Sequence, residues 1–325
     1  MNKIRWGIIG CGDVTEIKSG PAFNKVKNSE LVAVMRRNEE KVKDYARRHN
    51  VPKWYTDANA LINDPDINAI YIATPPSSHE EYTLAAIAAG KPVYVEKPMS
   101  VNAIAAKNMA DTAKKNNIKL SVAHYRRAQP LFKKIKQLVN ENAIGNPLYA
   151  RLELYKKPAT KEYLTAEHTG WRVDAAVAGG GLFNDLSPHQ LDLMYYFFGE
   201  TEKASGLSTN QGGVYKADDI VSGNILFKSR VIFNGLWCFN APKEKDSCEI
   251  VGTNGKISFS FFEHKSIVVT INGQTETLTF DPLPHVQQPM IEKVVEYFLD
   301  KGPNPDSGEE GVVVMQLIDK FTGRL

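Results

Sequence analysis

Two patterns of hydrophobic positions follow one another along the chain. From Ile4 to about Ala123, short apolar runs alternate with longer amphipathic segments. The runs IRWGII, LVAVM, AIYIA, PVYVE and LSVAH are rich in β-branched residues and apolar throughout, which is typical of strands buried on both faces. The intervening segments EEKVKDYARRH, HEEYTLAAIAAG and SVNAIAAKNMADTAKKNN have helical periodicity. This alternation predicts an α/β fold with a doubly wound parallel sheet.

Beyond Tyr125 the pattern changes. A helix over about residues 130–142 precedes longer, more strictly alternating segments: YARLELYK, DIVSGNILF, VIFNGLWCF, KISFSFF and SIVVTING. Turn signals such as Asn272-Gly273 separate them, so we predict a mostly antiparallel, open sheet with few intervening helices. Two helices, over about 286–301 and 308–321, end the sequence.

Length and composition fit this division. The 325 residues, 42% hydrophobic and 24% charged, favour two globular domains, which we place at residues 1–124 and 125–325. Basic residues exceed acidic ones by only three and are interspersed with them, so no nucleic-acid partner is predicted. The run from Arg127 to Lys136 is interpreted as a solvated helix face. The first apolar run is too short for a signal peptide or a membrane span, and three distant cysteines fit a reducing cytoplasm.

The turn after the first predicted strand carries a glycine motif, GIIGCGDVT. The first glycine, Gly10, permits a tight turn, and Gly12 lets a pyrophosphate approach the backbone at a helix N-terminus. Alone this spacing is weak, but at the start of a βαβ series it indicates a dinucleotide site. Thr15 stands at the third glycine position, and we expect its hydroxyl to face the phosphates. The predicted loop comprises Gly10, Cys11, Gly12, Asp13 and Val14.

The end of the second predicted strand indicates which dinucleotide binds. An acidic residue there accepts from the ribose 2′-hydroxyl of NAD, whereas a cation suits the 2′-phosphate of NADP. Arg36 and Arg37 stand at this position, about 20 residues beyond the glycines. Guanidinium groups match phosphate geometry, so NADP(H) is preferred over NAD(H). The alternative is a pair of surface arginines that pair with Glu39 and Glu40.

Two further segments carry candidate chemistry. Lys97 follows a predicted buried strand, in the sequence EKP. Because ligands bind outside the carboxyl ends of parallel strands, Lys97 is expected to face the cofactor cleft. The alternative is a lysine that points into water. In GGGLFNDLSPHQLD, the four-residue spacing of Asp185 and His189 places both on one face of a helix. If instead Pro188 opens the helix with Ser187 as N-cap, Asp185 lies in the entry turn.

The segments GIIGCG, ATPPSSH, AGKPVYVEKP and GGGLFNDLSPHQLD together resemble the glucose-fructose oxidoreductase and inositol dehydrogenase family. The resemblance implies a Rossmann domain and a C-terminal α/β domain whose sheet forms the oligomer interface, so a homodimer or homotetramer is expected. In such enzymes the EKP lysine lies beside the nicotinamide, and an Asp and a His of the second domain complete the site. The matching positions are Lys97, Asp185 and His189.

The resemblance also implies cofactor and substrate contacts. TGWRVDAAVAGGG resembles the NADP-dependent 1,5-anhydrofructose reductases, in which a Trp-Arg pair, here Trp171 and Arg172, contacts the cofactor. AHYRRAQP resembles a segment that lines the substrate cleft, so Tyr125 and Arg126 are candidates. The remaining predicted cofactor contacts are Thr74, Pro75, Pro76, His79, Glu96 and Lys97. A structural role is the default for His49, His79, His124, His168, His264 and His285.

The expected reaction is hydride transfer between NADP(H) and a CH–OH group of a sugar, cyclic polyol or related small molecule. His189 would carry the hydroxyl proton, Lys97 would stabilise the developing alkoxide, and Asp185 would bind substrate or orient the other two. No metal is expected, because the lysine supplies positive charge. Two alternatives stay open: a non-catalytic dinucleotide-binding regulator, and an NAD-dependent glycosidase of the same family.

Overall fold

The computed structural model describes residues 2–263 and 265–324, so the histidine prediction for His264 lies outside the described residues. The chain forms two compact units, Met1–Ala128 with Leu283–Val313 and Gln129–Pro282 with Val314–Leu325. The sequence had placed Leu283–Val313 in the second domain, whereas the structure places this segment in the first unit.

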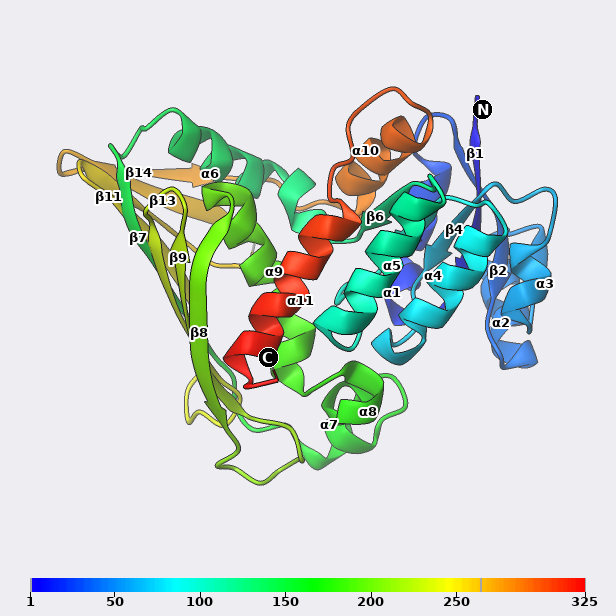
Figure 1. The fold of residues 1–325 in the computed structure, drawn as a ribbon, viewed down its shortest axis with the longest axis horizontal. Helices are drawn as coiled ribbons and strands as arrows, with labels where there is room; N and C mark the ends of the chain where they lie inside the picture. Colours follow the sequence, from blue (N-terminus) through cyan, green and yellow to red (C-terminus); the bar gives the residue numbers. More distant parts are fainter. Residues whose placement is uncertain (1, 264, 325) are drawn as a thin grey trace. The chain divides into compact units, whose positions relative to one another are not determined.

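A six-stranded parallel sheet forms the centre of the first unit, in the order β3-β2-β1-β4-β5-β6 (Figure 1). The predicted doubly wound sheet is therefore confirmed, and β3 is the one strand that the hydrophobic pattern did not reveal. Strands β4 and β5 are buried along their whole length, as expected for the middle of such a sheet. The strands are β1 (Ile4–Ile9), β2 (Ser29–Met35), β3 (Lys53–Tyr55), β4 (Ala69–Ile72), β5 (Val93–Val95) and β6 (Leu120–Val122).

The core of the first unit explains why the late segment Leu283–Val313 belongs to it. Trp6 of β1 lies with its ring centroid 4.9 Å from Phe23 and 5.5 Å from Phe298, which is in α10. Helix α10 thus supplies its apolar face to the core beside β1. The helices of this unit are α1 (Asp13–Ile17), α2 (Glu39–Arg48), α3 (Ala58–Ile62), α4 (His79–Ala88), α5 (Ala103–Lys115) and α10 (Gln288–Phe298), with the short 3₁₀ helices η1 (Gly20–Asn24), η2 (Pro76–Ser78) and η3 (Tyr125–Ala128).

An eight-stranded sheet forms the second unit, in the order β14-β13-β12-β11-β7-β10-β9-β8. Only the β7–β10 pair is parallel among these neighbours, so the predicted, mostly antiparallel sheet is confirmed. Strands β8, β11 and β14, which carry many polar residues, were not predicted. The strands are β7 (Pro147–Tyr155), β8 (Thr201–Thr209), β9 (Ile220–Phe227), β10 (Ile232–Cys238), β11 (Lys245–Gly252), β12 (Gly255–Phe259), β13 (Ser266–Ile271) and β14 (Gln274–Thr279).

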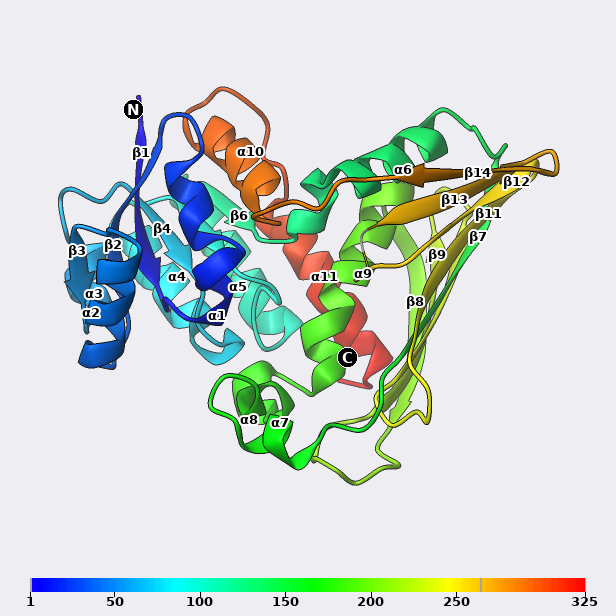
Figure 2. The same cartoon turned by 180° about the vertical axis from the view of Figure 1, so that it is seen from behind.

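The two faces of this second sheet differ. In β7, Leu152 and Leu154 are buried, whereas Tyr149 and Arg151 on the opposite face are exposed. Helices α6 (Pro130–Asn140) and α9 (Leu182–Phe198) lie along the buried face. Among the described residues of this unit, Figures 1 and 2 show no helix over the other face. The remaining helices are α7 (Lys161–Thr165), η4 (Gly170–Val173), α8 (Ala175–Ala178) and α11 (Gly308–Phe321), the last of which runs from the first unit into the second.

The basic run after residue 126 corrects one prediction. Lys133 is exposed on α6, but Arg127 is buried in η3. Its guanidinium lies 2.9 Å from the carboxylate of Glu310 and 3.5 Å from that of Asp306. Arg127 therefore belongs to a buried ionic network of the first unit rather than to a solvated face. Within residues 2–263 and 265–324, no helix has the length and apolar character needed to cross a membrane.

Candidate active site

The glycine turn has the form that a dinucleotide requires. Gly10 has φ of +91°, and a Cβ there would lie 2.8 Å from the backbone nitrogen of Thr74, so only glycine fits. Gly12 precedes α1 in an extended conformation, and a Cβ there would meet no protein atom closer than 4.0 Å. The fold itself therefore does not demand glycine at position 12. The open space beside it suits a pyrophosphate that approaches the backbone.

Thr15 and Cys11 have structural roles in this turn. Thr15 is buried, and its hydroxyl donates to the carbonyl of Gly12 at 2.8 Å. This contact forms because Thr15 lies about one helical turn beyond Gly12. The prediction that this hydroxyl faces the phosphates is wrong. Burial raises the pKa of the Cys11 thiol to about 12, so this side chain stays a neutral, packed group.

Arg36 lies beside the glycine turn. It follows the last residue of β2, is half-buried, and places its guanidinium 3.5 Å from the carbonyl oxygen of Cys11. Arg37 is exposed. The alternative, in which these arginines pair with Glu39 and Glu40, stays open; the Glu39 carboxylate also binds Lys43 at 2.6 Å, one turn along α2.

The segment that carries Lys97 is anchored by a buried carboxylate. Glu96 follows β5 and is 6% exposed. Its Oε1 accepts from the hydroxyl of Tyr71 at 2.6 Å and from Nε2 of Gln287 at 2.7 Å, while Oε2 accepts from the backbone N–H of Lys97 at 3.1 Å. The Lys97–Pro98 peptide bond is cis. Burial, followed by the neighbouring Glu96 carboxylate, raises the pKa of Tyr71, so the phenol remains a hydrogen-bond donor.

His79 connects the turns that follow β4 and β5. Its ring is fully buried, with Nε2 2.7 Å from the carbonyl of Thr74 and Nδ1 3.1 Å from the carbonyl of Pro98. Burial lowers the pKa of this imidazole, although the facing carbonyls oppose the shift. The ring nitrogens thus point at the backbone of two predicted cofactor turns, of which the first contains Thr74, Pro75 and Pro76. Contact of His79 with the cofactor itself stays a prediction.

Helix α9 carries the acid and the histidine of the second unit. It begins at Leu182, with Gly181 as N-cap, and contains Pro188 in its interior. The prediction of a helix that opens at Pro188, capped by Ser187, is wrong. The glycines permit this earlier start. A Cβ at Gly180 would lie 2.1 Å from Oδ1 of Asn184, in the first turn of the helix, and so would overlap its amide. Asp185 and His189 therefore lie four residues apart within one helix, on the same face.

Asp185 is held by a cation. Its Oδ2 lies 3.2 Å from Nε of Arg172, whose guanidinium is centred 4.5 Å from the ring of Trp171. Burial first, and then the Asp185 carboxylate, raises the pKa of the Tyr163 phenol. Sequence reasoning missed Tyr163, which lies in the short helix α7 within a polar stretch of the chain. The proposed cofactor contacts of Trp171 and Arg172 remain predictions.

His189 and Gln190 differ in their surroundings. His189 is 5% exposed, and its ring is nearly perpendicular to that of Phe262, at 6.2 Å. Gln190 accepts from the indole N–H of Trp237 at 2.7 Å in the core of the unit. Gln190 is therefore a structural residue of the core rather than part of a helix cap.

The other candidates of the first unit are buried. Tyr125 belongs to its hydrophobic core, and the guanidinium of Arg126 is centred 5.5 Å from the Tyr125 ring. Their contact with substrate stays a prediction. The imidazole of His124 lies 2.8 Å from Asp306. Burial would raise the pKa of Asp306, but Arg127 and His124 outweigh it and hold that pKa low.

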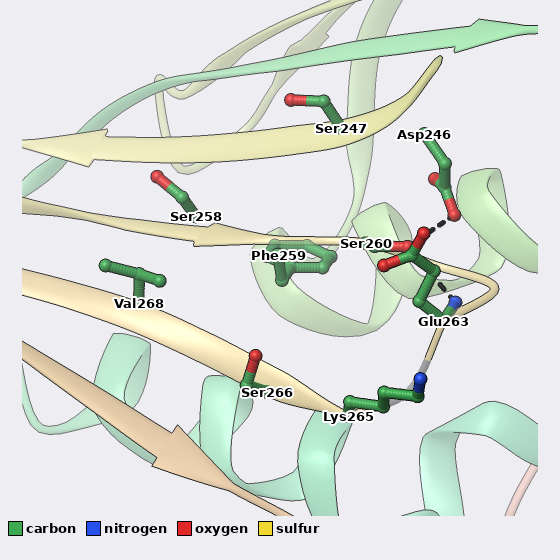
Figure 3. Close-up of a pocket in the computed structure, with 9 residues that line it drawn as sticks. All are labelled: Asp246, Ser247, Ser258, Phe259, Ser260, Glu263, Lys265, Ser266 and Val268. Carbon is green, nitrogen blue, oxygen red and sulfur yellow. Dashed lines mark hydrogen bonds between the residues drawn. The ribbon is translucent and has the colours of Figure 1, made fainter. Parts of the chain in front are cut away.

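Two surface hollows lie away from these residues, on the open face of the second sheet. One, of about 230 Å³, lies over β11, β12 and β13, and Figure 3 shows Ser247, Ser258 and Ser266 along the strands. The Asp246 carboxylate at its edge already accepts from Ser260 at 2.5 Å and from the amide of Phe262 at 2.7 Å. Neither hollow includes Asp185 or His189.

Comparison with known families fits both units. Residues 4–124 match the family described as "Oxidoreductase family, NAD-binding Rossmann fold", and residues 132–258 match the "GFO/IDH/MocA C-terminal domain". The chain belongs to the GFO/IDH/MocA oxidoreductase family. The predicted resemblance is thereby confirmed, and with it a nicotinamide dinucleotide as the cofactor class of the family.

Relatives in this family include enzymes with named substrates. The chain is 49% identical over 322 residues to "Oxidoreductase P35" of Formosa agariphila, with 99% of each chain covered. It is 29% identical to the 1,5-anhydro-D-fructose reductase of Ensifer adhaerens, over 78% of this chain and 74% of that one. A solved levoglucosan dehydrogenase, in complex with NADH and levoglucosan, has the same fold, with a TM-score of 0.87, 22% identity, and coverage of 99% and 97% of the two chains.

Proposed function

We propose that this GFO/IDH/MocA oxidoreductase transfers a hydride between NADP(H) and a CH–OH group of a sugar or cyclic polyol. The observation that carries the proposal is the anchored Lys97, at the carboxyl end of a parallel strand in a sheet whose first turn leaves room for a pyrophosphate. Ligands of open α/β sheets bind outside this edge.

The turn Gly10 to Val14 and the residues after β4 and β5 would hold the cofactor, which supplies the hydride donor or acceptor when bound. Arg36 supports the preference for NADP(H), because its guanidinium lies beside the turn and a planar cation suits a 2′-phosphate. The exposed Arg37 would add a second cation.

Side chains of this protein would bind the substrate and transfer its proton. Lys97 would donate a hydrogen bond to the reacting oxygen and so stabilise negative charge that develops on it. His189 would accept the hydroxyl proton during oxidation and return it during reduction. Asp185 would orient the substrate or the histidine, and Arg172 would hold Asp185 in place.

The substrate class follows from the named relatives and from the chemistry. The 1,5-anhydro-D-fructose reductase and two inositol dehydrogenases act on cyclic polyhydroxy compounds by their names. A site built from a lysine, a carboxylate and an imidazole suits a ring with several hydroxyls, because each can hydrogen-bond one of them.

We further propose that the enzyme is a cytoplasmic homodimer or homotetramer. Cys11, Cys238 and Cys248 are all free, as in a reducing compartment. The uncovered face of the second sheet carries the exposed apolar residues Tyr149, Ile232 and Leu236, which a second copy would cover.

The test is steady-state turnover with NADP(H) and NAD(H) over a panel of aldoses, inositols, dihydrodiols and 1,5-anhydrofructose. The proposal expects turnover of at least one polyhydroxy compound, with higher kcat/KM for NADP(H). Tight binding of either dinucleotide without turnover across the panel would instead support a regulator. Turnover only with NAD(H) would overturn the assignment of Arg36.

A further inference from the structure

A glutamine from late in the chain is joined to both halves of the proposed cofactor site. Gln287 is fully buried and precedes α10. Its backbone N–H donates to the carbonyl of Lys18 at 3.1 Å, just beyond α1 and the glycine turn. Its Nε2 donates at 2.7 Å to Glu96, which lies 191 residues earlier and precedes Lys97. One residue thus joins the end of the glycine-turn helix to the strand end that bears the proposed catalytic lysine.

The adjacent His285 strengthens the same attachment. Nζ of Lys25 lies 2.6 Å from its Nε2, and its Nδ1 lies 2.6 Å from the carbonyl of Ile17. Because the lysine ammonium can only donate, Nε2 accepts and Nδ1 carries the proton that is donated to Ile17. Segment 285–287 is therefore bonded at two points to the residues that end α1.

The environment of the Glu96 carboxylate is sensitive to the loss of a hydrogen-bond donor. The bonds recorded to this buried carboxylate come from three neutral donors: the Tyr71 hydroxyl, the Gln287 amide and the Lys97 backbone N–H. A buried carboxylate that loses a donor pays a desolvation penalty that surface groups avoid. It then shifts toward water or takes up a proton, and the Lys97 backbone bonded to it moves with it.

We infer that Gln287 is a positioning residue, which holds Glu96 and thereby fixes the Lys97 segment relative to the glycine turn. This inference rests on the proposed function, because it gives Lys97 its role. The titratable groups that face Glu96 are Tyr71 from β4, Tyr94 from β5 and His79 from α4.

The decisive variant is Gln287→Glu, which keeps the shape of the side chain but makes the bond depend on pH. When the introduced carboxyl is ionised, two carboxylates face each other without a donor. As the pH falls, the pair takes up one proton and the hydrogen bond to Glu96 forms again. Gln287→Met has a side chain of similar length but no donor at any pH. The ratio of kcat/KM between the two variants therefore cancels the pH dependence that all other groups contribute.

At pH 9 we expect both variants to lose about tenfold in kcat/KM, as for a lost hydrogen bond to a charged group. Toward pH 6, Gln287→Glu should recover to within about threefold of wild type while Gln287→Met does not. NADPH affinity, measured by quenching of tryptophan fluorescence, should follow the same pH dependence. Gln288→Glu is the matched control, because the side-chain amide of Gln288 donates to Glu292 on the surface of α10, and it should behave as wild type.

Equal pH profiles of Gln287→Glu and Gln287→Met, or wild-type behaviour of both, would overturn the inference. If Gln287→Glu does not fold, Tyr71→Phe removes another donor to the same oxygen and leaves the ring; unchanged kcat/KM and NADPH affinity would then contradict it. A wild-type protein that binds NADPH but turns over nothing would contradict the proposed function instead. In that case the pH dependence of NADPH affinity in the Gln287 variants still decides the role of Gln287.

Discussion

The two units hold their chemical groups in different ways. In the first, Lys97 follows a strand that is buried on both faces. Buried hydrogen bonds that Glu96 accepts from Tyr71, Gln287 and the Lys97 backbone fix the strand end. In the second, the sheet has one uncovered face, and Asp185 and His189 lie on helix α9. Asp185 forms a partly exposed ion pair with Arg172. The comparison indicates that the lysine tolerates little local change, whereas the acid is held in part by an exchangeable contact.

Among the variants that test this comparison, loss of the proton carrier should have the largest effect on kcat/KM. His189→Asn is expected to lower kcat/KM by about a hundredfold or more, because proton transfer from a positioned side chain contributes that much. Any limb of the pH–rate profile that belongs to the imidazole should vanish with it. His168→Asn, on an exposed segment of the same unit, is the control. Retention of at least a third of the wild-type rate would remove His189 from the mechanism.

Cofactor choice tests the first unit alone. Arg36→Ala should lower kcat/KM for NADPH by about ten- to a hundredfold and leave NADH nearly unchanged, because only NADPH loses a charge-assisted hydrogen bond. Arg47→Ala, whose side chain is 79% exposed on α2, serves as the control. Equal losses with both cofactors would mean that Arg36 supports the glycine turn structurally.

The ion pair of the second unit should give a smaller effect. Arg172→Ala removes the cation 3.2 Å from Asp185, and a several-fold fall in kcat/KM is expected for a partly exposed pair. Arg172→Lys should recover part of the loss. Arg151→Ala on the open sheet face should have none, since this side chain is 65% exposed. A loss from Arg172→Ala as large as that from His189→Asn would refute the contrast between the two units.

The smallest effect concerns acid stability of the first unit. Arg48 first, and then His49, hold the pKa of Glu16 at about 2, below its ordinary value of 4.5, although burial opposes them. A lowered carboxyl pKa stabilises the fold above the ordinary value, and the contribution is lost as the pH falls from 4.5 toward 2. Glu16→Gln should therefore lower the Tm slightly at pH 7 and leave it nearly unchanged at pH 2. An equal difference at both pH values would contradict this assignment.

Much of the fold was predictable from the sequence, for a physical reason. Strands buried on both faces are continuous apolar runs, so β1, β2, β4, β5 and β6 were visible. Strands β8, β11 and β14 escaped because a sheet with an uncovered face allows polar residues on that face and along its edges. The return of α10 to the first core was hidden, because an amphipathic helix does not reveal which sheet it covers.

The candidate site was predictable only where the residue type itself carries chemistry. Gly10, Lys97, Asp185 and His189 could be selected by motif and spacing. The contacts that hold them could not, because Gln287 lies 191 residues from Glu96 and Arg172 pairs with Asp185 through an irregular segment. Tyr71 was the one indication of these contacts in the sequence, since the hydroxyl of a tyrosine inside an apolar strand needs a buried hydrogen-bond partner.

The most direct test of the central claim compares wild type with Lys97→Met on the best substrate of the panel, with Lys107→Met on the surface of α5 as control. For each protein, NADPH affinity is measured by fluorescence beside the steady-state rate. We predict that Lys97→Met binds NADPH nearly as wild type does but turns over at least a hundredfold more slowly, because it loses the cation that stabilises the developing alkoxide. A Lys97→Met enzyme of nearly wild-type rate would contradict the proposed mechanism.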